Sequence, residues 1–386
     1  MRNAVIVDAV RTPIGRRNGM LKDWHPVDLA AETLKALVER TGVDPERIDD
    51  VIMGCVSQVG EQGYNVGRNA VLAAGFPESV PGSTVDRQCG SSQQSAHFAA
   101  QGVMAGAYDV VVAAGVEAMT RVPMGSSVQS GPGAPFGPTM MERYENSLVP
   151  QGVSAELIAE KWGFDRERMD SLSLESHRRA TVAAEEGRLD GHLIPIEVKT
   201  DEGAALMTRD EGVRPDTSME ALGGLRTAFK EDGVITAGNS SQISDGASAL
   251  MIMGEDTAEA LGLEPKARFK AFAVAGTDPI LMLTGPIPAT AKVLERAGMS
   301  LDDIDLFEVN EAFASVVAAW LHETGVDHSK VNVNGGAIAN GHPLGASGGK
   351  LMADLVWEMQ RTGAAYGLQT MCEGGGMANA TILERV

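Results

Sequence analysis

LVERTGVDPERIDDVIMG, at residues 37–54, returns in altered form as VLERAGMSLDDIDLFEVN at residues 293–310. The two stretches align without gaps and share Glu39/Glu295, Arg40/Arg296, Gly42/Gly298, Ile48/Ile304 and Asp49/Asp305. In each, the pattern predicts a helix that ends near the glycine, an acidic connection, and an Ile-Asp pair that opens a strand. Because the helix end, the turn and the strand start all agree, the repeat indicates a duplicated fold.

On either side of this repeat, short apolar runs alternate with helical patterns. Buried strands are predicted at residues 3–10, 49–56, 109–116, 303–310 and 366–371, and helices at residues 29–40 and 350–360. Strands that alternate with helices are typical of proteins whose sheets are covered on both faces. The predicted fold class is therefore α/β.

The duplication also predicts domain boundaries. We expect an N-terminal domain at residues 1–262 and a C-terminal domain at residues 265–386. The C-terminal domain would open with the strand ARFKAFAVAG at residues 267–276.

A segment at about residues 119–243 interrupts the pattern of the first half and is predicted to be an inserted loop domain, or lid. It contains SSVQSGPGAPFGPTM (126–140), which is a loop by composition, and two helices expected to be opened by Ser154 and Asp165. Long insertions in compact domains usually carry function.

Composition excludes several classes of protein. The net charge of −20 argues against binding to nucleic acid or to an anionic membrane, so an anionic substrate would need capture by local Arg or Lys. The three cysteines, Cys55, Cys89 and Cys372, form no CxxC pair, which is typical of a reduced, intracellular protein. The N-terminal run reads as a strand rather than a signal peptide, and no apolar run approaches the ~20 residues of a membrane span. We expect a cytoplasmic protein.

Cys89 lies in VDRQCGSSQQ (85–94), between a possible short strand and a predicted helix. A cysteine at a helix N-terminus is a candidate nucleophile, because the helix dipole favours the thiolate and lowers the pKa from about 8.5. Free cysteines are also common as inert core residues. This motif alone leaves both interpretations open.

Three further residues have chemical potential. Cys372 ends a predicted strand before three glycines, a loop that can present N–H groups to an oxyanion or can be a plain turn. His342 lies among glycines and Pro343, which suits a positioned base or oxyanion donor better than a loop histidine. Asn310 ends a strand, the usual place for function in α/β sheets. Cys55, with no turn to present it, is interpreted as structural.

Other motifs bear on whether the protein uses a serine nucleophile, a metal ion or a bound cofactor. GASGG (345–349) matches the GxSxG nucleophile elbow, but no strand precedes it, so Ser347 is expected to cap the following helix. A serine hydrolase that uses Ser347 is kept as a remote alternative. No metal-ligand motif or P-loop is present. TAGNSSQISDGA (236–247) can cradle a cofactor or form a simple turn.

Taken together, the motifs resemble those of the thiolase family, in its order and spacing over essentially the whole chain. They are VRTPIG (10–15), CGSS (89–92), TAGNSSQISDGA (236–247), GPIPAT (285–290), NEAFA (310–314), NGGAIANGHPLGASG (334–348) and CEGGG (372–376). The resemblance implies two duplicated βαβαβαββ halves in a layered αβαβα sandwich with an inserted loop domain. It also implies a homodimer or homotetramer.

The resemblance implies an acyltransferase that cleaves 3-ketoacyl-CoA with free CoA, or runs the reverse Claisen condensation. Cys89 would be the acylated nucleophile, His342 would take its proton, and Cys372 would shuttle a proton to the acetyl α-carbon. Asn310, through a bound water, and His342 would form one oxyanion hole. The backbone N–H groups of Cys89 and Gly374 would form the other.

Coenzyme A would be the co-substrate, with no permanently bound cofactor and no metal. By resemblance, Ala237 and Ser241 contact its pantetheine, and Ala312 and Phe313 line the channel. Arg214, in VRPDTS, is expected at the nucleotide end.

The chain departs from the family pattern at three places. Glu373 follows Cys372 directly, and its charge is expected to keep that thiol protonated. Ala378 and Asn379 stand where another glycine is common. Pro150-Gln151-Gly152 replaces the His-Met-Gly of short-chain acetoacetyl-CoA thiolases.

The substrate is less defined than the reaction. VDRQCGSSQQ, MLTGPIPAT and GLQTMCEGGG resemble degradative thiolases, including some that act in steroid breakdown. The alternatives are a biosynthetic acetoacetyl-CoA thiolase that condenses two acetyl-CoA molecules and a non-catalytic CoA-binding protein.

Overall fold

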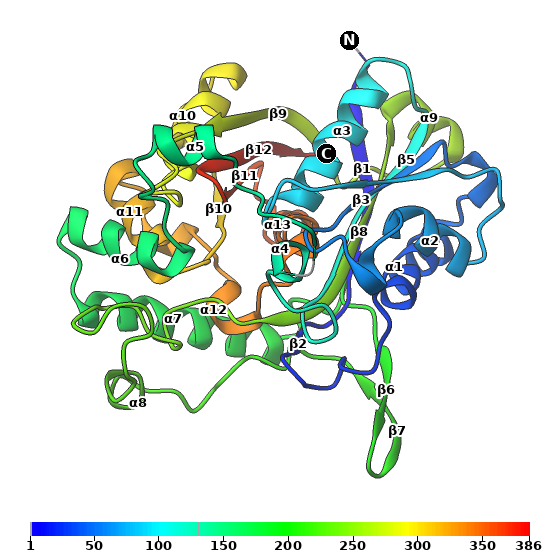
Figure 1. The fold of residues 1–386 in the computed structure, drawn as a ribbon. Helices are drawn as coiled ribbons and strands as arrows, with labels where there is room; N and C mark the ends of the chain where they lie inside the picture. The colour runs from blue at the N-terminus through cyan, green and yellow to red at the C-terminus, as the bar shows by residue number, and fades with distance from the viewer. Residues whose placement is uncertain (1, 130) are drawn as a thin grey trace.

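The computed structural model describes residues 2–129 and 131–386. Residue 1, the first of the predicted N-terminal domain, and residue 130, inside the predicted 126–140 loop, lie outside the described residues. One large mixed sheet crosses the molecule in the order β10-β11-β12-β9-β1-β8-β5-β3-β4 (Figure 1). Its strands are β1 (Ala4–Arg11), β3 (Asp50–Gly54), β4 (Gly82–Val85), β5 (Val110–Ala118), β8 (Ser244–Gly254), β9 (Ala267–Gly276), β10 (Leu306–Val309), β11 (Tyr366–Glu373) and β12 (Met377–Arg385). The short β2 (Gly15–Arg16) pairs with β8, and β6 (Ile196–Thr200) and β7 (Gly203–Met207) form a separate hairpin.

The two halves of the sheet have the same strand order. β3 pairs in parallel with β5, and β10 pairs in parallel with β11. β5 and β11 pair antiparallel with β8 and β12, which in turn pair antiparallel with β1 and β9. In the second half, a parallel bridge between Phe307 of β10 and Val331 takes the place of the parallel pairing between β3 and β4 in the first half. The predicted duplication is confirmed, and the halves join where β1 pairs with β9.

The helices form three layers around the two halves of the sheet (Figure 1). They are α1 (Pro26–Thr41), α2 (Val66–Ala73), α3 (Ser91–Met104), α4 (Ser126–Gln129), α5 (Pro138–Arg143), α6 (Gln151–Trp162), α7 (Arg166–Glu185), α8 (Met219–Gly223), α9 (Glu255–Leu261), α10 (Pro286–Ala297), α11 (Ala314–Thr324), α12 (Ala337–Asn340) and α13 (Ser347–Thr362). α3 and α13 share one buried core with strands of both halves. α1 and α2 pack on the other face of the first half, and α10 and α11 on the other face of the second. The α/β class and the layered αβαβα arrangement are therefore confirmed.

The repeated stretch has the same backbone design in both halves. α1 ends at Gly42, whose φ is 67°, and α10 ends at Gly298, whose φ is 65°. Such left-handed helix ends favour glycine because it has no Cβ. The shared glycines are therefore helix C-caps, as the sequence predicts.

The segment between β5 and β8 differs from the prediction in two details. The predicted 126–140 loop contains the short helices α4 and α5. The helix expected to open at Ser154 begins at Gln151, because Ser154 donates through its Oγ to Ile280 O at 2.5 Å instead of capping. Asp165 does cap α7, since its carboxylate accepts from Arg168 N–H at 2.8 Å. No described helix has the length and apolar character needed to cross a membrane.

Candidate active site

Cys89 lies in the turn between β4 and α3, and it is 4% exposed. Gln88 turns the chain just before it with a φ of 50°, in the left-handed region. Ser91 holds the turn, because its Oγ donates to Gln88 O at 2.6 Å and accepts from Arg87 N–H at 2.9 Å. The cysteine then packs against apolar side chains, namely Met119, Leu344, Leu351 and Met371.

The environment of Cys89 stabilises the protonated thiol. Burial, followed by the charge of Glu373, raises the pKa of Cys89 to about 12, while a hydrogen bond from the Gln151 side chain acts in the opposite direction. The prediction that the helix start lowers this pKa is wrong. Cys89 precedes the N-cap Gly90, and the loss of hydration outweighs the favourable helix dipole. A base must therefore remove the proton before Cys89 can attack.

His342 is held in one tautomer. Its Nδ1 lies 2.5 Å from Ser347 Oγ, and this hydroxyl donates its own proton to Pro343 O at 2.8 Å. Ser347 must then accept from Nδ1–H, which leaves the lone pair on Nε2. Nε2 faces Asn310, whose Nδ2 is 3.4 Å away. Burial, and next the charge of Lys350, lower the pKa of His342 to about 3, so the ring is neutral and able to accept a proton.

Ser347 does not have the predicted role of helix cap. The N-cap of α13 is Ala346, and Ser347 is the first residue of the helix. Its hydroxyl is committed to His342 and Pro343 instead, and the residue is 1% exposed. The same contacts disfavour Ser347 as a hydrolytic nucleophile, because its proton is directed at a backbone carbonyl.

Cys372 lies at the end of β11, next to Cys89. It is 0% exposed, and burial, followed by the charge of a Cys89 thiolate, raises its pKa well above the usual value. Gly374 opens the turn that follows, and a Cβ there would lie 3.0 Å from Gln88 Oε1. The turn after β11 therefore packs against the turn that carries Cys89.

The five predicted catalytic residues come together in one buried region. Leu344, two residues after His342, belongs to the same buried apolar cluster as Cys89. Asn310 contacts His342 and donates its N–H at 3.1 Å to Thr370 O, two residues before Cys372. The Oδ1 atom of Asn310 is buried and has no partner among the described residues, so it is available to a bound water.

Glu117 is a structural carboxylate that the sequence did not identify. It is fully buried and accepts from Val56 N–H at 2.9 Å, Ser57 N–H at 3.0 Å, Gln62 Nε2 at 2.7 Å and Gly345 N–H at 2.8 Å. It thereby joins the loop after β3 to the turn that follows His342. The signal in the sequence was a single carboxylate at the end of a buried strand.

Gln242 and Ser244 hold the other side of the His342 turn. Gln242 Nε2 donates to Ile338 O and Ala339 O, each at 2.9 Å. Ser244 Oγ accepts from His342 N–H at 3.1 Å. Part of the TAGNSSQISDGA motif thus positions the histidine rather than a cofactor.

The structure brings three of the predicted CoA contacts together. Ser241 N–H donates to Ala312 O at 2.9 Å, and Phe313 lies 5.9 Å from Phe229 in an edge-on arrangement. Phe229 was not predicted, and it is 43% exposed, so this aromatic pair extends from the interior to the surface. It also covers Gly152, where a Cβ would lie 2.2 Å from the ring.

The other two predicted CoA contacts lie at the surface. Ala237 is exposed, and Arg214 is exposed with its N–H donating to His177 Nδ1 at 3.1 Å. Among the described residues, no hydrogen bond or ion pair joins Arg214 to Ser241 or Phe313.

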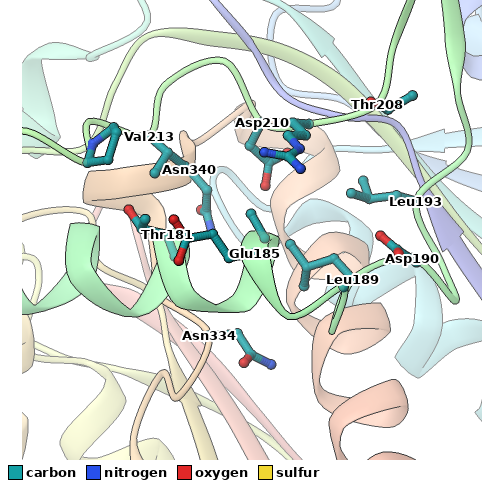
Figure 2. A pocket seen from close by; sticks show the side chains of 15 residues that line it. Thr181, Glu185, Leu189, Asp190, Leu193, Thr208, Asp210, Val213, Asn334 and Asn340 are labelled. Carbon is teal, nitrogen blue, oxygen red and sulfur yellow. The ribbon is translucent and has the colours of Figure 1, made fainter.

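A cavity of about 460 Å³ lies beside α7 (Figure 2). Glu185, Asp210, Asn334 and Asn340 line it, and Asn340 is two residues before His342. None of the predicted catalytic residues is among its described lining residues. In the part of the chain that the structure describes, no group of three His, Cys, Asp or Glu side chains is arranged to hold a metal ion.

Gln151 is a further residue beside the nucleophile. It is the first residue of α6, and its side chain is close enough to Cys89 to lower the pKa of the thiol. A signal for this residue was present in the sequence, because Gln151 belongs to the stretch that departs from the short-chain thiolase pattern.

Comparison with known families assigns both halves of the chain. Residues 4–256 match the model of the thiolase N-terminal domain, and residues 263–385 match that of the thiolase C-terminal domain. A crystal structure of an acetyl-CoA acetyltransferase from Bacillus anthracis has a TM-score of 0.91 at 40% identity, over 100% of this chain and 99% of that one. Human mitochondrial 3-ketoacyl-CoA thiolase also has a TM-score of 0.91, at 38% identity and the same coverage.

Curated relatives extend over the full chain. A steroid 3-ketoacyl-CoA thiolase from Mycobacterium tuberculosis is 49% identical over 100% of this chain and 95% of its own length. A 3-ketoacyl-CoA thiolase from Bacillus subtilis is 44% identical over 100% of both chains. The chain therefore belongs to the thiolase family and is an acyltransferase.

Proposed function

We propose that this thiolase is degradative and cleaves a 3-ketoacyl-CoA with free CoA through an acyl-Cys89 intermediate. The main support is the pairing, in one buried region, of a neutral Cys89 thiol with a histidine whose Nε2 is free to accept a proton. A thiolate is the natural nucleophile for thioester exchange. The neutral imidazole of His342 has an unshared electron pair on Nε2 that can take the proton.

The steps follow from these positions. His342 Nε2 takes the proton of Cys89, and Sγ attacks the 3-keto carbon. The bond between C2 and C3 then breaks, and the departing acetyl-CoA enolate takes the proton of Cys372, which burial keeps protonated. CoA finally gives its thiol proton to the Cys372 thiolate and attacks the acyl-Cys89 thioester. The shortened acyl-CoA is released, and the departing Cys89 thiolate takes its proton back from His342, which restores both thiols.

Two groups of donors would stabilise the negative oxygens in these steps. The first is Asn310, through a water, together with His342 after it has been protonated. The second is the pair of backbone N–H groups on Cys89 and Gly374. Donors fixed in a buried site are effective because they need no reorganisation during the reaction.

The nucleophile is tested by replacing it. Cys89→Ser should lose nearly all thiolysis and should form no acyl-enzyme detectable by intact-protein mass spectrometry. Cys55→Ala, which alters a buried cysteine of the first-half core, is the matched control. Full activity of Cys89→Ser, as expected for a hydrolase that uses Ser347, would disprove the proposal.

The CoA arm is proposed to lie along Ala237, Ser241, Ala312 and Phe313, with Arg214 towards the nucleotide. Support comes from the contact of Ser241 with Ala312 and from the partly exposed Phe229 beside Phe313. Phe229→Ala should raise the KM for CoA. Leu206→Ala, at an exposed site on the β6–β7 hairpin, is the control.

The acyl group is proposed to come from lipid breakdown, with a steroid-derived chain as the favoured case because the Mycobacterium tuberculosis relative carries that name. Relative kcat/KM over a panel of 3-ketoacyl-CoAs, from four-carbon to ring-bearing chains, tests this. A preference for condensing two acetyl-CoA molecules would favour the biosynthetic alternative instead.

We also propose a cytoplasmic homodimer or homotetramer. The sheet ends at β4, a short edge strand that is available for pairing with a second copy. Light scattering coupled to size-exclusion chromatography would measure the assembly, and a monomer would contradict it.

A further inference from the structure

Glu373 is a buried carboxyl group without hydrogen bonds. It is 0% exposed, and neither Oε1 nor Oε2 has a partner among the described residues. Its ion-pair partner is Arg87, whose Nη1 lies 3.9 Å from Oε2, too far for a direct hydrogen bond. A buried carboxylate that lacks donors is costly, and the group reduces this cost by holding a proton.

The carboxyl group is directed at the residue after the nucleophile. A Cβ on Gly90 would lie 2.0 Å from Glu373 Oε1 and 2.8 Å from Asn379 Nδ2. Asn379 Nδ2 donates to Gly90 O at 3.0 Å. Glu373 and Asn379 are both departures from the usual thiolase pattern, and they converge on the backbone next to Cys89.

The charged groups around Glu373 come from two elements. Arg87 and Asp86 lie on the turn before Cys89, and Cys372 is its neighbour on β11. Burial raises the pKa of Glu373 to about 8, Arg87 lowers it, and Asp86 raises it. Glu373 is the second-largest cause of the raised Cys89 pKa, after burial. It is the smallest of the four causes that act on the pKa of Cys372. The charge of Glu373 therefore raises the pKa of both thiols: that of Cys372, as the sequence predicts, and also that of Cys89.

We propose that Glu373 is a positioning residue whose proton, controlled by Arg87, sets the reactivity of Cys89. As a neutral acid it allows Cys89 to lose its proton, and as a carboxylate it opposes a second negative charge nearby. The proposal rests on Cys89 as the nucleophile. It implies that the reactivity of Cys89 is restrained as the pH rises through about 8.

The test compares wild type with Glu373→Gln, which keeps the shape and removes the charge. We would measure kcat/KM for thiolysis and the rate of Cys89 alkylation by iodoacetamide, located by peptide mass spectrometry. The ratio of variant to wild type should be near one at about pH 6.5 and should rise about tenfold by about pH 9.5. Taking the ratio cancels the ionisation of CoA and of the reagent.

Arg87→Met tests the second half of the proposal. Removing the cation raises the pKa of Glu373, so in this background the ratio should rise at a higher pH. Glu384→Gln, which removes a carboxylate from β12 at the other end of its pairing with β11, is the control and should give a flat ratio.

Two results would overturn the proposal: a flat ratio for Glu373→Gln, or an equal loss of activity at every pH, which indicates a purely structural role. If Glu373→Gln fails to fold, Arg87→Met alone is compared with wild type. The pH at which Glu373 begins to restrain the alkylation of Cys89 must then be higher in Arg87→Met, and an unchanged pH would also overturn the proposal. Failure of the proposed function is recognised separately, because Cys89→Ser would then keep thiolysis while Cys89 alkylation would still report on Glu373.

Discussion

Ser347 Oγ lies 2.5 Å from His342 Nδ1 and acts on the histidine as an acceptor, because its own proton goes to Pro343 O at 2.8 Å. This relationship explains why a GxSxG-like motif occurs in a thiolase. The serine fixes the tautomer of the base, and Nε2 is thereby left free towards Asn310. Ser347 is a positioning residue in this arrangement.

Ser347→Ala should therefore lower the kcat of thiolysis by about tenfold or more, because the wrong tautomer then competes with the right one. Ser347→Thr, which keeps the hydroxyl, should recover most of the loss. Ser329→Ala, at an exposed site, is the control. Unchanged kcat in Ser347→Ala would show that the tautomer is fixed by other contacts.

The neutral state of His342 predicts that kcat/KM does not fall in the weakly acidic pH range, where an ordinary histidine base would become protonated. Burial lowers the pKa of His342 to about 3, so the base stays unprotonated through the weakly acidic range. The kcat/KM for the 3-ketoacyl-CoA should then be constant from about pH 7 down to about pH 5, below the ordinary histidine value of about 6.5. An acid limb centred near 6.5 would contradict this burial effect.

Asp354 is predicted to stabilise the fold through a buried charge cluster. It accepts from Arg11 Nε at 2.8 Å, Lys350 Nζ at 2.9 Å and His192 Nε2 at 2.7 Å. Asp354→Asn leaves Arg11 and Lys350 under-compensated and should reduce the free energy of unfolding by about 3–5 kcal/mol. Asp256→Asn, in an exposed pair with Arg2, should barely change Tm.

The pH dependence of stability has a definite sign at Asp354. Its cationic partners hold the pKa of this carboxyl well below the usual range when the protein is folded. The stabilisation is therefore present above the unfolded pKa of about 3.9 and is lost as the pH falls through the folded value. Acid denaturation of Asp354→Asn should show a weaker dependence on pH over this range, and an identical dependence would count against the role of Asp354.

The repeated residues show why the fold could be predicted from the sequence. Asp49 accepts from Asp109 N–H at 2.6 Å and Val110 N–H at 3.1 Å, at the start of β5. Asp305 accepts from Ala365 N–H at 2.7 Å and Tyr366 N–H at 3.0 Å, at the start of β11. The same side chain performs the same task in both halves, so local sequence carries the information.

The candidate site could be predicted only in part. Local motifs identified Cys89, His342 and Cys372, because turns and glycines leave a pattern in the sequence. The pKa of Cys89 was mispredicted because it depends on burial and on Glu373, which are consequences of tertiary packing. Phe229 and Glu117 were missed for the same reason, since their partners are far away along the chain.

Gln151 is predicted to assist the nucleophile directly. Its side chain lies beside Cys89 and lowers the pKa of that thiol. A hydrogen bond to a charged sulfur is worth about 1.5–3 kcal/mol, so Gln151→Met, which conserves volume, should lower kcat/KM by roughly tenfold or more. Alkylation of Cys89 at constant pH should slow in parallel. Gln101→Met, at an exposed site on α3, is the matched control, and a Gln151→Met enzyme as reactive as wild type would remove Gln151 from the mechanism.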